Sequence, residues 1–115
     1  MYGVVAPDFF VYGDNIPWNP ANYGAGKAGV IQFTKYGASA LAARSILVNS
    51  ITPGCFPKVT PGFDQGFLER LSNKAMMKRV DEAEELDGAL LLLASDASSF
   101  MTGQNIIFDG SATAW

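Results

Sequence analysis

Residues 21–54 have the sequence ANYGAGKAGVIQFTKYGASALAARSILVNSITPG, which indicates a helix followed by a buried strand. We expect the helix to begin near residues 20–22 and to continue to about residue 43. Residues 46–51 form a run rich in β-branched side chains, typical of a strand buried on both faces. Residues 52–54, Thr-Pro-Gly, then end the strand in a sharp turn. A helix and a strand in this order are typical of an α/β fold.

The expected helix carries apolar residues on most of its circumference. They include Ala25, Ala28, Val30, Ile31, Phe33, Tyr36, Leu41 and Ala42. A helix of this kind must be buried on most sides. Gly24, Gly26, Gly29 and Gly37 each lower its stability by up to about 1 kcal/mol relative to alanine. We therefore expect close packing to hold it, with one face on a sheet and another against a second helix.

The remaining segments fit the same fold class. We expect a strand end at residues 2–6, a loop to residue 21, a Pro/Gly-rich loop at 55–66, a helix at 67–77, a helix from 81 to about 95–96, and a last strand and turn at 104–110. Asp81 and Glu84 have the spacing of an Asp-x-x-Glu capping box at the start of the second of these helices. No internal repeat interrupts this order.

The composition is that of one small globular domain, residues 1–115, and it excludes several classes of function. A net charge of −3 with dispersed cations gives no basic stripe for nucleic acid. One cysteine and no histidine exclude an internal disulfide, zinc fingers and histidine-based catalysis. The longest apolar run, residues 89–94, is too short to cross a bilayer, so we expect no membrane partner and a cytoplasmic location. The slightly positive mean hydropathy suggests that a partner covers some apolar surface.

Tyr23 and Lys27 stand four residues apart at the start of the expected helix, so their side chains share one face. A phenol with a pKa of about 10 is a poor acid or base at neutral pH, and a nearby cation favours its charged form. This pairing is suited to acid–base chemistry without histidine. Taken alone, the spacing arises easily by chance.

Several separate blocks place this pair in context. They are NYGAGKAGV at residues 22–30, ILVNSITPG at 46–54, EEL at 84–86, LLASDASS at 92–99, and TGQ to DG at 102–110. In order and spacing they resemble the second half of short-chain dehydrogenases/reductases, over nearly the whole chain. The resemblance implies an α/β fold, the C-terminal part of a Rossmann-like, doubly wound parallel sheet.

The resemblance also implies roles for individual residues. Tyr23 would exchange a proton with the hydroxyl or carbonyl of a small-molecule substrate. Lys27 would bind the nicotinamide ribose of NAD or NADP and stabilise the ionised form of the tyrosine. Pro53 and Gly54 would form the turn beside the nicotinamide, with backbone groups such as those of Phe56 near its carboxamide. Residues 55–77 would cover the substrate, and the protein would be a homo-oligomer.

The sequence departs from the family pattern in several places. Gly26 stands where the family usually has serine, Lys58 where a cofactor-contacting threonine is common, and Ser111 where a glycine is usual. Residues 1–22 contain neither serine nor threonine, so the catalytic serine is expected before Met1, and no glycine-rich phosphate loop follows a strand. We therefore expect residues 1–115 to be the C-terminal catalytic half without its dinucleotide-binding half, inactive alone. The alternative is a non-catalytic fragment or truncated gene product that only self-associates.

Other candidate sites have simpler explanations. Cys55 lacks a histidine to activate it and is expected to be a plain buried side chain. The acidic residues Asp81, Glu82, Glu84 and Glu85 complement a helix dipole and need no metal. An apolar patch, either core or interface, is expected from the aromatic residues Phe9, Phe10, Tyr12, Trp18 and Trp115.

Overall fold

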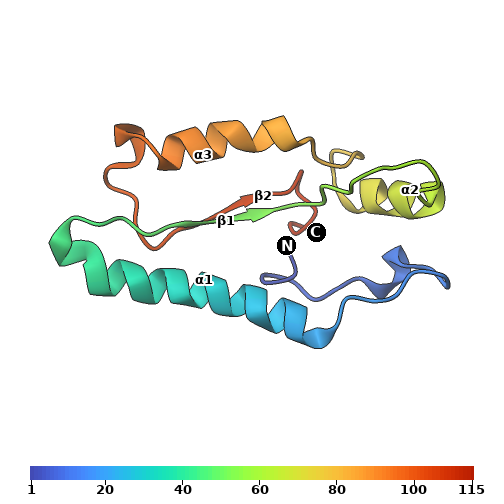
Figure 1. Ribbon diagram of the computed structural model, residues 1–115, viewed down its shortest axis with the longest axis horizontal. Helices are drawn as coiled ribbons and strands as arrows, with labels where there is room; N and C mark the ends of the chain where they lie inside the picture. Colours follow the sequence, from blue (N-terminus) through green and yellow to red (C-terminus); the bar gives the residue numbers. More distant parts are fainter.

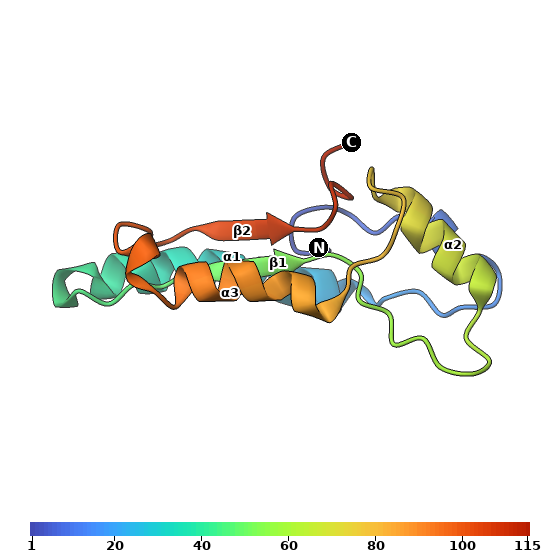
Figure 2. The ribbon, with the colours of Figure 1, turned by 90° about the horizontal axis from the view of Figure 1, so that it is seen from above.

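The computed structural model describes all residues, 1–115, as a short parallel sheet between helices (Figure 1). Strands β1 (Ser50–Pro53) and β2 (Asn105–Phe108) pair in parallel, with Ser50 opposite Asn105. Helix α1 (Ala21–Leu41) covers one face of the sheet and α3 (Asp87–Leu93) the other. Figure 2 shows the same layers from above, with α2 (Gln65–Lys74) beyond the carboxyl ends of the strands. The α/β fold class and the parallel pairing are confirmed.

Four short 3-10 helices complete the secondary structure. They are η1 (Phe9–Val11), η2 (Ala42–Arg44), η3 (Ala83–Leu86) and η4 (Asp96–Ser98). The first precedes α1, the second extends its carboxyl end, and the other two flank α3. Between β1 and β2 the chain passes through α2 and α3, which is the crossover that a parallel pair requires.

Helix α1 begins after Pro20, as expected, and is far less buried than its sequence predicts. Pro20 supplies the fixed φ of −69° at the N-cap, and the regular helix ends at Leu41. Only Thr34 and Ala38 are buried, while Phe33 is 70% and Tyr36 68% exposed. The expectation of burial on most sides is therefore wrong for this chain, because one face packs on β1 and the opposite face meets no other element.

The strands are shorter than predicted because their flanks pair irregularly. Residues 46–49 run beside the segment before β2, but much of the contact is made by side chains. The amide of Val48 donates to Oγ1 of Thr102 (3.0 Å), and the Asn49 side chain donates to the carbonyl of Met101 (2.8 Å). Gly103, with φ +73°, bends the partner segment out of strand geometry. Residues 2–6 form a turn and not the predicted strand end, because the chain bends back onto α1.

The helix boundaries near α3 also differ from the sequence prediction. The capping box is made by Glu82 and Glu85 at η3 and not by Asp81 and Glu84. Arg79 holds both oxygens of Glu85 at 2.6 Å, which fixes the carboxylate over the amide of Glu82. Helix α2 lies at residues 65–74 in place of 67–77, because the side chain of Asp64 accepts from the amide of Phe67 (2.9 Å) and caps it.

The chain has a small core and much uncovered apolar surface. Its accessible surface is 7,634 Å², against about 6,100 Å² for a compact protein of this mass. Its radius of gyration is 16.1 Å, against about 13 Å for a compact domain of this length. Only 10 of 115 residues are buried. Helices α1 and α3 thus present apolar faces with no cover from this chain. No helix is both long and apolar enough to cross a membrane.

Candidate active site

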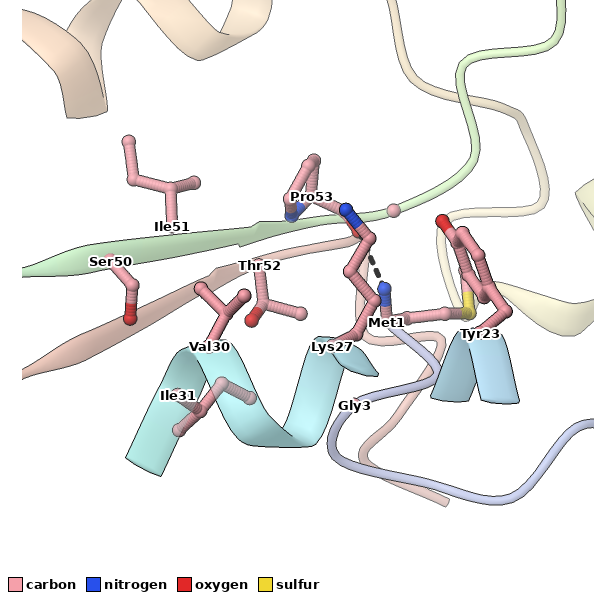
Figure 3. Close-up of a pocket in the computed structure, with 11 residues that line it drawn as sticks. Met1, Gly3, Tyr23, Lys27, Val30, Ile31, Ser50, Ile51, Thr52 and Pro53 are labelled. Carbon is pink, nitrogen blue, oxygen red and sulfur yellow. Dashed lines mark hydrogen bonds between the residues drawn. The ribbon is translucent and has the colours of Figure 1, made fainter. Parts of the chain in front are cut away.

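Tyr23 and Lys27 project from the first turns of α1 toward the carboxyl end of β1 (Figure 3). The Lys27 ammonium lies 5.5 Å from the centroid of the Tyr23 ring, within cation–π range. This geometry follows from the four-residue spacing on one helix face. The sequence prediction that these two side chains lie together is confirmed.

The first residues of the chain pack directly on this part of α1. A methyl group on Gly3 would lie 2.7 Å from the carbonyl carbon of Lys27, and one on Gly24 would lie 3.0 Å from the carbonyl oxygen of Tyr2. The two glycines therefore allow the backbones to touch. The α-amino group of Met1 donates to the carbonyl of Pro53 (3.1 Å), and burial lowers its pKa. The N-terminal turn thus fixes the distance between α1 and the end of β1.

A cavity of about 180 Å³, which we call the strand-end cavity, lies between α1 and β1. Its wall carries Tyr23, Lys27 and residues 50–54 of the strand and its turn. Parallel sheets bind ligands at the carboxyl ends of their strands, so the position is typical of a ligand site. Figure 3 shows the Lys27 ammonium close to Pro53 at this end.

A second cavity of about 240 Å³, which we call the aromatic cavity, adjoins the first. Met1, Tyr23 and Gly54 line both. The other lining residues come from the N-terminal loop, the turn after β1, and α2: Tyr2, Tyr12, Asn19, Cys55, Phe56, Pro57, Phe67 and Leu71. Tyr23 therefore stands on the boundary between two cavities of different chemistry.

The structure places most of the predicted site residues together. Pro53 and Gly54 lie beside Tyr23 and Lys27 in the strand-end cavity. Phe56 lies on the wall of the aromatic cavity and not of the strand-end cavity. Its predicted role in cofactor binding stays a prediction.

Cys55 lines the aromatic cavity, and burial raises the pKa of its thiol, with the charge of Asp81 adding to the effect. The thiol is therefore protonated at neutral pH and a poor nucleophile, as its interpretation as a structural side chain requires.

Asp81 lies beside Gly54 at the site, although its sequence pattern indicated only a role at the start of a helix. A methyl group on Gly54 would collide with its carboxylate and would lie 2.9 Å from Cα of Asp109. One carboxylate oxygen of Asp81 is buried without a hydrogen-bond partner. Burial, with repulsion from Glu85 and Asp109, raises the pKa of this carboxyl. Only glycine fits at position 54, and no sequence signal predicts that an acidic side chain lies behind it.

The predicted aromatic patch is divided in the structure. Phe9 and Trp18 pack with ring centroids 4.7 Å apart, and both line a larger hollow of about 570 Å³. Trp115 lies elsewhere and donates from its indole nitrogen to the carbonyl of Lys74 (2.7 Å). The hollow has no acidic or basic side chain in its wall, so it offers no acid–base chemistry.

Comparison with known proteins identifies the family. The sequence model of a family described as enoyl-(acyl carrier protein) reductase matches residues 10–113. A short-chain dehydrogenase from Leptospira borgpetersenii, solved with bound NAD⁺, superposes with a TM-score of 0.84 and 34% identity over 97% of this chain. The chain belongs to the short-chain dehydrogenase/reductase family. It corresponds to 41% of that Leptospira dehydrogenase, which confirms the α/β assignment as part of a Rossmann-type sheet.

Two curated members of the short-chain dehydrogenase/reductase family show how the chain relates to whole enzymes. Trans-4-hydroxycyclohexanecarboxylate dehydrogenase of Sinomonas cyclohexanicum is 41% identical over 97 residues, 84% of this chain and 36% of that enzyme. The 3-oxoacyl-[acyl-carrier-protein] reductase FabG of Thermotoga maritima is 41% identical over 90 residues, 77% of this chain and 37% of that enzyme. The chain thus spans less than two fifths of the length of these relatives.

Proposed function

We propose that this chain supplies the proton-transfer and substrate-binding part of an NAD(P)-dependent oxidoreductase that interconverts an alcohol and a carbonyl compound. The observation that carries the proposal is the position of Tyr23, on the wall shared by the strand-end and aromatic cavities with the Lys27 ammonium beside it. A group that passes a proton to a substrate next to a cofactor needs access to both.

The strand-end cavity is the proposed site of the nicotinamide and its ribose. Lys27 and Tyr23 offer hydrogen-bond donors to ribose hydroxyls, and Pro53 and Gly54 leave the strand end free of bulky side chains. Phe56 backbone groups, just after this turn, are proposed to contact the carboxamide. When bound, the cofactor supplies or accepts the hydride.

Tyr23 carries out the acid–base half of the reaction. In carbonyl reduction its O–H donates a proton to the carbonyl oxygen as that oxygen gains charge. In alcohol oxidation the Tyr23 oxygen accepts the hydroxyl proton. The Lys27 ammonium stabilises the phenolate that remains after proton donation, because an opposite charge nearby favours the ionised form. The names of the Sinomonas and Thermotoga relatives, a hydroxy-acid dehydrogenase and a 3-oxoacyl reductase, support this reaction class.

We also propose that the isolated chain has no dehydrogenase activity. Positioning of reactants contributes about 7 to 11 kcal/mol to catalysis, and this chain has no glycine-rich loop to hold a dinucleotide. Residues 1–22 also contain no serine that could donate to the developing oxyanion, and the loss of such a donor removes about 3 kcal/mol more. A second candidate, a self-associating assembly module, is favoured by one observation, the uncovered apolar faces of α1 and α3.

The test replaces the matched 41% of the Leptospira dehydrogenase with this chain and measures NADH and NADPH oxidation with a panel of ketones. We expect turnover that Tyr23→Phe lowers at least about 100-fold in kcat/KM. Tyr36→Phe on the exposed face of α1 is the matched control and is expected to leave turnover unchanged. Turnover that persists in Tyr23→Phe would overturn the assignment.

A further inference from the structure

A directional hydrogen-bond chain ends in the aromatic cavity. The Asn19 side-chain amide donates to the Tyr12 hydroxyl (2.9 Å), and the Tyr12 hydroxyl donates to the Tyr2 hydroxyl (3.2 Å). Each hydroxyl has one proton to give. Tyr12 gives its proton to Tyr2, and the Tyr2 O–H has no acceptor among the hydrogen bonds of this chain. All three side chains line the cavity that Tyr23 also lines, so a ligand there meets a free donor.

Packing and backbone contacts hold the residues of this hydrogen-bond chain in place. Tyr12 is buried and packs on Phe67, with ring centroids 6.0 Å apart. The guanidinium of Arg70 donates to the carbonyl of Val11 (2.7 Å), which ties η1 to α2. Gly24 holds the Tyr2 backbone against α1. A donor held in this way keeps its direction before a ligand arrives, which is what a positioning residue needs.

The lining of the aromatic cavity is unfavourable for a charged ligand. No acidic or basic side chain lines it, and the aromatic rings of Phe56 and Phe67 form much of its wall. The α-amino group of Met1 is already held by the carbonyl of Pro53, and burial lowers its pKa. Burial also keeps Cys55 a neutral thiol by raising its pKa. An anion entering the cavity would lose water without gaining a free counter-ion, which is strongly unfavourable.

The size of the cavity favours one ring. An engineered protein cavity of about 150 Å³ holds benzene. At about 240 Å³ the aromatic cavity has room for a single substituted six-membered ring.

The Tyr2 hydroxyl is held in its neutral form. Burial raises the pKa of the Tyr2 hydroxyl. Tyr2 therefore remains a neutral donor at alkaline pH, whereas proton exchange is assigned to Tyr23.

We propose that Tyr2, held by Tyr12 and Asn19, is a substrate-positioning residue whose free O–H binds a second oxygen of a compact, neutral, cyclic substrate, such as a hydroxyketone or diol, while the reacting oxygen lies at Tyr23. The proposal rests on the proposed function. The expected substrate is therefore an uncharged ring that carries two oxygens, one bound by Tyr2 and the other by Tyr23.

The test measures binding of two probes to the full chain by saturation-transfer NMR. Cyclohexanone has one oxygen and 1,4-cyclohexanedione has two. We expect the wild-type chain to bind the dione more tightly by about three- to tenfold, beyond the twofold statistical factor, as one hydrogen bond between neutral groups would give. Tyr2→Phe should abolish this preference and leave cyclohexanone affinity unchanged.

A second variant separates hydrogen-bond direction from packing. Asn19→Asp replaces the donor to Tyr12 with an acceptor, so Tyr12 would donate to the new carboxylate and accept from Tyr2. The Tyr2 hydroxyl would remain, but it would donate its proton to Tyr12 and not to a ligand. We expect Asn19→Asp to lower the dione preference to the Tyr2→Phe value, with near-UV circular dichroism confirming the fold, and Tyr36→Phe to keep the wild-type preference.

The outcomes distinguish this proposal from the proposed function. Tyr23→Phe should weaken both probes equally and keep their ratio. A wild-type ratio equal to that of Tyr2→Phe, or no binding of either probe, would overturn the role of Tyr2. Binding of the anionic 4-oxocyclohexanecarboxylate as tight as that of the dione would overturn the neutral substrate class.

Discussion

Substituting Gly3 by alanine tests the contact that places the N-terminal turn on the catalytic helix. The new methyl group would lie 2.7 Å from the carbonyl carbon of Lys27 and 2.9 Å from the amide nitrogen of Ala28. These are backbone atoms in the second turn of α1, so no side-chain rotation relieves the clash. Either the turn lifts off α1 or the helix moves at Lys27.

The expected magnitude follows from the cost of overpacking. Forcing a methyl group into a tight contact destabilises a protein by about 1 to 3 kcal/mol. For a chain of this length each kcal/mol lowers Tm by about 4 °C, so Gly3→Ala should lower Tm by about 4 to 12 °C. Gly26→Ala is the matched control, because nothing lies within 4 Å of a methyl group there and the position is exposed. Helix propensity predicts a gain of about 1 kcal/mol, or about 4 °C.

The assay is thermal unfolding followed by circular dichroism at 222 nm, at one protein concentration for the wild type and both variants. The two glycines should shift Tm in opposite directions. An unchanged or raised Tm for Gly3→Ala would refute the close contact between the N-terminal turn and α1. A lowered Tm for Gly26→Ala would show that this face of α1 is covered, contrary to the structure.

Three further outcomes follow from the structure. Arg79 lowers the pKa of Glu85 to about 2, so the pair stabilises the fold above the ordinary pKa near 4.5 and loses this effect as pH falls toward 2. Urea midpoints between pH 6 and 2 should therefore fall less steeply in Glu85→Gln, and parallel profiles would argue against the pair. Cys55 should react with a disulfide reagent at pH 8 at least about tenfold more slowly in the folded chain than in urea, because burial raises the pKa of its thiol. Equal rates in the two conditions would contradict its burial. Light scattering at micromolar concentration should give a mass above the 12.3 kDa monomer, because α1 and α3 expose apolar faces, and a single monomer mass would count against self-association.

Local patterns in the sequence predict the elements around Tyr23 well. The start of α1 follows from Pro20 and the meeting of Tyr23 and Lys27 from their spacing. Each of these features depends on residues close together in the chain, which is why pattern and propensity suffice for them. The predicted end of the first strand is two residues early, because Thr52 and Pro53 still pair with β2.

Features that depend on distant contacts were missed or misplaced. Of the overlapping patterns Asp81-x-x-Glu84 and Glu82-x-x-Glu85, the first has the better N-cap residue, because aspartate is preferred at that position. The contact of Arg79 with Glu85 favours the second. The predicted burial of α1 is too high, because an apolar helix sequence indicates that the helix needs packing partners but does not show that this chain contains them.

The chain of hydrogen bonds from Asn19 to Tyr2 had no sequence signal. Tyr12 follows Tyr2 by ten positions, and only the path of the chain through η1 brings their hydroxyls to 3.2 Å. The contact of Asp81 with Gly54 likewise joins segments from opposite ends of the α2 region.

The central claim is that Tyr23 and Lys27 form the proton-transfer part of a site that the isolated chain does not complete. The most direct test assays the isolated chain for NADH and NADPH oxidation with ketones and 3-oxoacyl thioesters, beside the chain grafted into the Leptospira dehydrogenase. We predict no measurable turnover by the isolated chain and Tyr23-dependent turnover by the graft. Turnover by the isolated chain that disappears in Tyr23→Phe would contradict this prediction, and would show that 115 residues rebuild a complete cofactor site by themselves.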